Sequence, residues 1–272
     1  MIIDGHAHSC GEFFEAKGII EKINRLKVDK VVLLPGVKNG PVQYNYIPGL
    51  AKIFNRADML FAANKMIRLL STVQQTDDLM ERNKYVYLLY SKHPDRIIQF
   101  LWVDPHSDKL EADLHEKYKS WGYRGIKLHQ CTHNFASDSR ELAVVIDFAR
   151  EKELPVIIHL RSPRDVTGFI NTAIKHPRVN FIIAHLIGLE LFISNRALDN
   201  LYFDISPAPL ISLKRINLAI NSFGAEKVLL GSDTPFGKNN LAQNLNKIYE
   251  LKISANEKDL IMGGNLQRLL KL

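Results

Sequence analysis

Two histidines separated by one residue stand near the start of the sequence, in the run D-G-H-A-H at residues 4–8. The apolar residues Ile2 and Ile3 precede this run, which is typical of a β-strand. Because side chains alternate along a strand, His6 and His8 should point to the same side. Two imidazoles placed in this way can share one metal ion at about 2.0–2.1 Å each. The same pattern also suits two polar histidines at a strand edge, so the rest of the chain must decide between these interpretations.

Several apolar segments later in the chain finish in a titratable residue. They are Lys127 and His129 in G-I-K-L-H, His159 in V-I-I-H, His185 in F-I-I-A-H and Asp233 in G-S-D. A buried imidazole needs hydrogen-bond partners, so buried apolar strands rarely finish in histidine by chance. The recurrence favours a shared metal site over several unrelated core histidines.

Short apolar segments alternate with segments of helical spacing along the chain. Strands are predicted over residues 31–34, 97–103, 125–128, 155–160, 181–184, 201–205 and 228–230, after the first strand that carries His6 and His8. Continuous apolar strands between helices are typical of a parallel α/β sheet covered by helices. The number of strands favours a closed (β/α)₈ TIM barrel over an open sheet. In such barrels the active site lies at the C-terminal ends of the strands, where the polar residues above fall.

Helical segments lie between the predicted strands, and one long stretch of the chain does not fit this alternation. Apolar spacing predicts helices over residues 12–26, 107–119 (with Ser107 as the cap), 137–152, 166–175, 188–198, 210–223, 240–251, 256–262 and 266–270. Residues 36–49 are predicted as loop and 50–90 as two or more helical segments, which is more chain than a strand connection needs. We therefore expect a single TIM-barrel domain over residues 1–272, with a lid or insertion at about 36–90 or a contact between copies in a homodimer.

Composition restricts the class of protein and its partners. The 272 residues are 46% hydrophobic and 24% charged, as in ordinary soluble globular proteins. Cys10 and Cys131, the two cysteines, do not suggest a disulfide framework and fit a reducing cytoplasm. We find no signal peptide and no apolar run that would span a membrane, so no membrane partner is expected. The net charge of +7 is spread among acidic residues, which argues against a nucleic-acid partner and suits attraction of a small anionic substrate.

Taken together, these motifs resemble the amidohydrolase superfamily, and most closely its amidohydrolase-related (amidohydrolase 2) branch of metal-dependent hydrolases and decarboxylases. The matching pieces are D-G-H-A-H at 4–8, H-P-D-R-I at 93–97, G-Y-R-G-I-K-L-H at 122–129, L-P-V-I-I-H at 154–159, F-I-I-A-H at 181–185, G-S-D-T-P at 231–235 and G-G-N-L-Q-R-L-L at 263–270. They span nearly the whole chain in the right order. The set is specific for the superfamily and not for one substrate.

The resemblance implies that His6, His8, His159 and Asp233 bind a metal and that His185 is a nearby catalytic histidine. Three neutral imidazoles and one carboxylate suit Zn²⁺, with Mn²⁺ as the alternative. Asp233 would also accept a proton from the metal-activated water. His185 would stabilise the developing oxyanion or donate a proton to the leaving group.

Three further residues are candidates for substrate binding. Lys127 has the residue type and strand of the carboxylated lysine that bridges two metals in other members of the superfamily, in which case His185 would bind the second metal. In the single-metal branch, Lys127 would instead pair with an acid or bind substrate. Arg161, two residues past His159, could bind a substrate carboxylate or form a surface ion pair. His129 ends the same strand as Lys127 and could face the substrate.

The function expected from these features is metal-dependent hydrolysis of an amide, lactone or ester-like bond in a small molecule. The alternative is non-oxidative decarboxylation of an unsaturated or aromatic carboxylic acid at the same site. A catalytically inactive binding barrel is a third interpretation, but it would predict decay of the metal ligands and none of their positions is missing.

Overall fold

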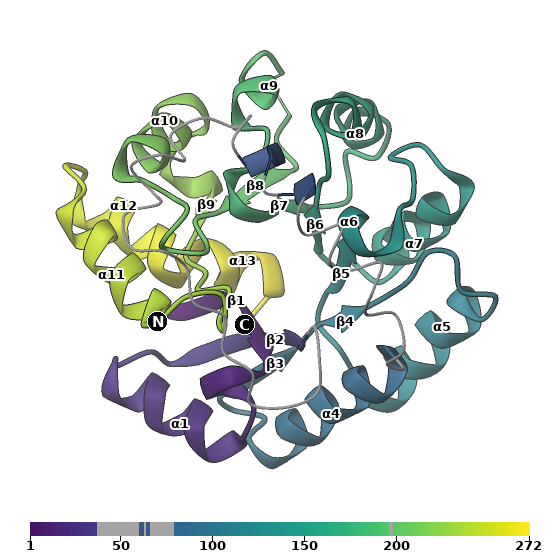
Figure 1. Cartoon of the computed structure of the whole chain (residues 1–272), viewed down its shortest axis with the longest axis horizontal. Coiled ribbons are helices and arrows are strands. Elements are labelled where there is room, and N and C mark those ends of the chain that lie inside the picture. Colours follow the sequence, from purple (N-terminus) through teal and green to yellow (C-terminus); the bar gives the residue numbers. More distant parts are fainter. Residues whose placement is uncertain (37–59, 63, 66–78, 196–197) are drawn as a thin grey trace.

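Parallel strands form a closed barrel with helices around it (Figure 1). The computed structural model describes residues 1–36, 60–62, 64–65, 79–195 and 198–272. The strands are β1 (Ile3–Ser9), β2 (Lys30–Pro35), β3 (Ile97–Gln99), β4 (Leu101–Trp102), β5 (Ile126–His129), β6 (Val156–His159), β7 (Phe181–Ile183), β8 (Leu201–Asp204) and β9 (Val228–Leu229). The helices are α1 (Ala16–Arg25), α4 (Leu79–Lys92), α5 (Leu110–Trp121), α6 (Gln130–His133), α7 (Arg140–Glu151), α8 (Pro163–Lys175), α9 (Leu189–Ile193), α10 (Leu213–Phe223), α11 (Asn240–Glu250), α12 (Ala255–Asp259) and α13 (Asn265–Leu270).

Two seams join the strands β1–β3 to the strands β4–β9. At the first seam, β3 and β4 are consecutive pieces of one strand, and the amide of Phe100 between them donates to the carbonyl of Leu33 at 3.2 Å. At the second seam, the amide of Gly5 in β1 donates to the carbonyl of Leu230 after β9 at 2.9 Å. Ala7 and Thr234 also form a parallel bridge there. The predicted TIM barrel is therefore confirmed.

The pairing of β1 with β2 determines which way the first two histidines point. Ile3 pairs with Lys30 and His8 pairs with Leu34, and the register shifts between Asp4 and Ala7. Because Lys30 and Leu34 lie on one face of β2, Ile3 and His8 share a face although they are an odd number of positions, five, apart. Because of this register shift, Ile3 at the start of β1 and the imidazoles of His6 and His8 at its end all face the barrel interior.

The predicted strands are all present, whereas several helices begin or end elsewhere. The helix predicted from Ser107 begins at Leu110, since the Ser107 hydroxyl accepts a bond from the Lys109 amide in the preceding turn at 3.3 Å. The helix predicted from residue 137 begins at Arg140, after Ser139 accepts the Leu142 amide as its cap. The helix predicted over 188–198 is the shorter α9.

The predicted insertion at about 36–90 lies mostly outside the described residues. In its described part, residues 79–90 belong to α4, as the helical spacing predicts. None of the helices in the described ranges is long and apolar enough to cross a membrane.

Candidate metal centre

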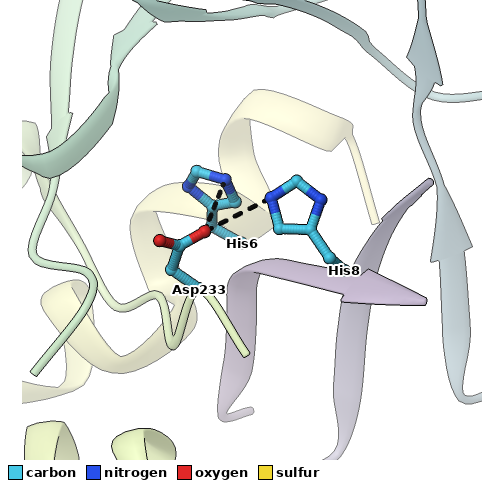
Figure 2. A group of neighbouring side chains, drawn as sticks. All are labelled: His6, His8 and Asp233. Carbon is cyan, nitrogen blue, oxygen red and sulfur yellow. Dashed lines mark ion pairs between the residues drawn. The ribbon is translucent and has the colours of Figure 1, made fainter. Parts of the chain in front are cut away.

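Figure 2 shows His6 and His8 of β1 turned toward Asp233, which follows β9. The Nε2 atoms of His6 and His8 lie 3.5 and 3.3 Å from Oδ1 of Asp233. All three side chains are buried. One ligand atom from each falls within 4.8 Å of the others, which is close enough for one ion to contact all three.

Hydrogen bonds on the far side of each ring define which nitrogen faces Asp233. Nδ1 of His8 lies 2.7 Å from the carbonyl oxygen of Pro35, and Nδ1 of His6 lies 2.8 Å from Oδ2 of Asp204. A carbonyl and a carboxylate can only accept, so each ring carries its proton on Nδ1 and its lone pair on Nε2. Two imidazole lone pairs and a carboxylate oxygen thus point to one place, and this donor set fits a divalent metal ion.

Burial and neighbouring side chains together set the protonation states in the form that a metal requires. Burial, together with the nearby charge of Lys127, lowers the pKa of His6 to about 4 against the opposing effect of Asp204. Burial alone would raise the pKa of Asp233, but the imidazole of His185 and those on β1 hold that pKa below its ordinary value. At neutral pH His6 is therefore neutral and Asp233 ionised.

Backbone contacts to β1 position Asp233. Its amide and that of Ser232 donate to the carbonyl oxygen of His6, at 2.6 and 3.0 Å. Asp233 has a φ of 53°, in the left-handed region that is unfavourable for residues with a Cβ. The end of β9 is thus held against the strand that carries the histidines.

His185 follows β7 and lies beside His6. Its Nδ1 lies 2.8 Å from the carbonyl oxygen of Ser206 and 4.0 Å from Oδ2 of Asp233. Its ring stacks on that of His6 with the centroids 5.2 Å apart. The bond to Ser206 assigns the proton to Nδ1 and leaves the Nε2 lone pair available.

Lys127 of β5 reaches the same group of side chains. Its side chain is 1% exposed, and Nζ lies 3.3 Å from Nε2 of His6. Burial lowers the pKa of Lys127 to about 8, while the carboxylates of Asp233 and Asp204 oppose the shift. Lys127 therefore lies beside His6, and its role in binding metal or substrate stays a prediction.

His159 lies next to this group with its Nε2 bound elsewhere. Nε2 lies 2.9 Å from Oδ1 of Asn64, whose Nδ2 in turn donates to the carbonyls of Leu160 and Arg161, both at 3.0 Å. Because Nδ2 of Asn64 is the donor, His159 carries its proton on Nε2 here. The role of His159 as a metal ligand stays a prediction.

The other two substrate-binding candidates have different surroundings. The guanidinium of Arg161 forms a two-pronged ion pair with Asp165, at 3.0 and 2.9 Å, and also bonds to Asn134. This is the ion-pair alternative that the sequence leaves open. His129 stacks between His159, at 4.1 Å, and Trp102, at 5.7 Å, and so lies near the candidate metal centre.

Sequence reasoning missed Asp204 and Asn64. Asp204 ends β8, so the rule that polar residues at strand ends form the site would have found it. Asn64 lies in the long segment between β2 and α4, where no motif distinguishes it from its neighbours.

Solved structures with the same fold align along the whole chain. A probable 2-pyrone-4,6-dicarboxylic acid hydrolase from Acinetobacter baumannii, with citric acid bound, is 14% identical, covers 100% of this chain and 99% of its own, and has a TM-score of 0.68. The 5-carboxyvanillate decarboxylase from Sphingomonas paucimobilis is 12% identical, with coverage of 100% and 99% and a TM-score of 0.63. An uncharacterised TIM-barrel protein from Bordetella bronchiseptica is 14% identical, with coverage of 99% and 98% and a TM-score of 0.70. At these identities the matches establish a shared fold and not a shared reaction.

No functionally curated protein matches the sequence. A family model described as amidohydrolase matches residues 3–272. The chain therefore belongs to the amidohydrolase 2 family.

Proposed function

We propose that this protein is a metal-dependent hydrolase that cleaves an amide, lactone or ester-like bond in a small molecule. The observation that carries the proposal is the convergence of Nε2 of His6, Nε2 of His8 and Oδ1 of Asp233, with both Nδ1 atoms engaged on the far side. We propose one divalent ion per chain, Zn²⁺ in the first place and Mn²⁺ as the alternative. Such an ion supplies a Lewis acid that activates water and polarises the scissile carbonyl.

Two residues would move protons around the reacting atoms. Asp233 is ionised, buried and next to both β1 histidines, so its carboxylate can accept a proton from the attacking water. His185 donates to Ser206 through Nδ1 and has a lone pair at Nε2, so Nε2 would take up the proton that Asp233 accepts from water and pass it to the leaving group. His159 would complete the ligand set by exchanging its bond to Asn64 for the metal.

Elemental analysis of the purified, tag-free protein tests the proposal, with His6→Ala and Asp233→Ala alongside. We expect about one transition metal per chain in the native protein and a loss of at least ten-fold in metal occupancy in both variants. His159→Ala examines the fourth ligand, with Asn64→Ala as its matched control because that change removes the partner of His159 and leaves the imidazole in place. Two metals per chain would indicate a binuclear site with Lys127 and His185 as ligands. No bound metal after reconstitution with Zn²⁺ or Mn²⁺ would refute the proposed function.

Decarboxylation of an unsaturated or aromatic acid is the second candidate, because a structurally similar protein is named as a decarboxylase and the same side chains could serve both reactions. A panel of small lactones, amides and aromatic acids distinguishes them, since hydrolysis releases acid and decarboxylation releases carbon dioxide. A substrate carboxylate could bind Arg161 only in exchange for Asp165. Arg161→Gln should therefore raise KM for acidic substrates, by about ten-fold, only if this exchange occurs.

A further inference from the structure

Asp204 at the end of β8 has no role in the chemistry above, yet both of its oxygens are committed. Oδ2 lies 2.8 Å from Nδ1 of His6. Oδ1 accepts the backbone amide of Ser206 at 2.8 Å and also the Ser206 hydroxyl. The side chain is 1% exposed, so water does not compete for these bonds.

We propose that Asp204 is a positioning residue that holds His6 in the tautomer with the proton on Nδ1, so that Nε2 can serve as a metal ligand. The carboxylate only accepts at Nδ1, which fixes both the proton and the orientation of the ring. The other side of the ring agrees independently, because Lys127 donates toward Nε2 at 3.3 Å and therefore needs a lone pair there. The link to metal affinity rests on the proposed metal-dependent function, whereas the tautomer does not.

An asparagine at this position has nearly the same shape and reverses the hydrogen-bond pattern. The backbone amide of Ser206 is a fixed donor, so the asparagine oxygen must face it and the NH₂ group must face Nδ1 of His6. His6 would then accept at Nδ1 and carry its proton on Nε2. That proton would point at the place where Nε2 must bind a metal.

Asp4 offers a matched control in the same part of the barrel. It is fully buried, and its Oδ1 accepts the backbone amides of Ser232 at 2.8 Å and His6 at 3.3 Å. These bonds involve the backbone of His6 and not its ring. Like Asp204→Asn, Asp4→Asn replaces one carboxylate oxygen with an NH₂ group. It does so two residues from His6 but reverses no hydrogen bond to the imidazole.

The experiment combines ¹⁵N NMR of the metal-free, full-length protein labelled at histidine with Zn²⁺ binding measured by chelator competition. His6→Gln identifies the His6 resonances. We expect the Nδ1–H tautomer in the native protein and in Asp4→Asn, and the Nε2–H tautomer in Asp204→Asn. The Zn²⁺ dissociation constant should rise 10–100-fold in Asp204→Asn and stay within about three-fold in Asp4→Asn.

Each outcome has a definite meaning. An Asp204→Asn protein that keeps the Nδ1–H tautomer with native zinc affinity would overturn the inference. If that variant does not fold, the native protein alone decides, since an Nε2–H tautomer in its metal-free form would overturn the inference as well. A native protein with the Nδ1–H tautomer that binds neither Zn²⁺ nor Mn²⁺ would refute the metal-dependent function while supporting the assigned role of Asp204 toward His6.

Discussion

Two residues of the candidate metal centre have left-handed backbone conformations although both carry a Cβ. The φ angle is 64° at His185 and 53° at Asp233. Such conformations cost about 1–2 kcal/mol for residues other than glycine, and they persist where neighbouring contacts hold them. At His185 the bond to Ser206 and the stacking on His6 are contacts of this kind.

This backbone conformation predicts an unusual order of stability among variants of His185. Both His185→Gly and His185→Ala lose the imidazole, but only alanine retains a Cβ in the left-handed region. We expect the free energy of unfolding of His185→Gly to exceed that of His185→Ala by about 1 kcal/mol, as measured by urea denaturation. At Glu116, an exposed position within α5, Glu116→Ala should instead be more stable than Glu116→Gly by about 1 kcal/mol. An alanine variant at 185 as stable as the glycine variant would contradict this explanation.

Asp4 predicts a pH dependence of stability. Burial raises its pKa to about 7 from its ordinary value of 3.8, against hydrogen bonds from Ser232 and His6 that lower it. Between pH 3.8 and pH 7 the folded protein therefore binds more protons at Asp4 than the unfolded chain does. The contribution of Asp4 to the free energy of unfolding is fully present below pH 3.8 and is lost as the pH rises through 7.

Asp4→Asn removes this titration. The free energy of unfolding of the metal-free native protein, relative to that of Asp4→Asn, should fall by about 4 kcal/mol between pH 4 and pH 8, following about 1.4 kcal/mol per pKa unit. Urea unfolding of both proteins across this range measures the difference. A constant difference would show that Asp4 has the same pKa in the folded and unfolded states.

Among the elements, β1 has the most demanding geometry. It contains a register shift, closes the barrel against β9 and carries His6 and His8. Gly5 permits this close approach, since a Cβ there would lie 2.8 Å from the Leu230 carbonyl oxygen and 3.1 Å from a Leu266 methyl group. The strand can therefore place its imidazoles only if Gly5 has no side chain.

Gly5→Ala should consequently weaken both the fold and the site. We expect a loss of about 3 kcal/mol in the free energy of unfolding, because the backbone of Leu230 cannot move away cheaply. Zinc affinity should fall as well, since His6 follows directly. Gly122→Ala is the control: its φ is +64° with no atom within 4 Å of the added Cβ, so it should cost about 1 kcal/mol and leave zinc affinity unchanged. Equal effects of the two changes on zinc binding would argue against this role of β1.

The sequence predicted the strands well because their apolar runs are short, continuous and bounded by polar residues. It also placed His6, His8, His185 and Asp233 together, since strand ends of a parallel barrel meet at one end. The starts of the helices were predicted less well. Ser107 and Ser139 both have the side chain of a good cap, but only Ser139 caps the helix after it, whereas the hydroxyl of Ser107 bonds within a turn. The bond between His159 and Asn64 depends on a long-range contact that has no local pattern in the sequence.

For the molecule as a whole, a metal that binds only the folded barrel should stabilise it. A ligand at 100 times its dissociation constant contributes about 2.7 kcal/mol, which corresponds to a rise of about 5–10 °C in Tm for a chain of this size. Removing the metal with a chelator should lower Tm by this amount, and adding Zn²⁺ should restore it. Asp233→Ala should show no response to the chelator. An equal response in that variant would place the stabilising ion elsewhere.

The candidate metal centre joins side chains that are far apart in the chain. Asp204 bonds to His6 across 198 residues, and Ser232 beside Asp233 bonds to Asp4 across 228. During synthesis, the histidines of β1 leave the ribosome long before the carboxylate that completes their site. A nascent or truncated chain that lacks the segment after β9 therefore lacks the carboxylate of Asp233, and metal loading would mark a chain whose barrel has closed. A cell would in this way avoid an active fragment of the enzyme before its fold is complete.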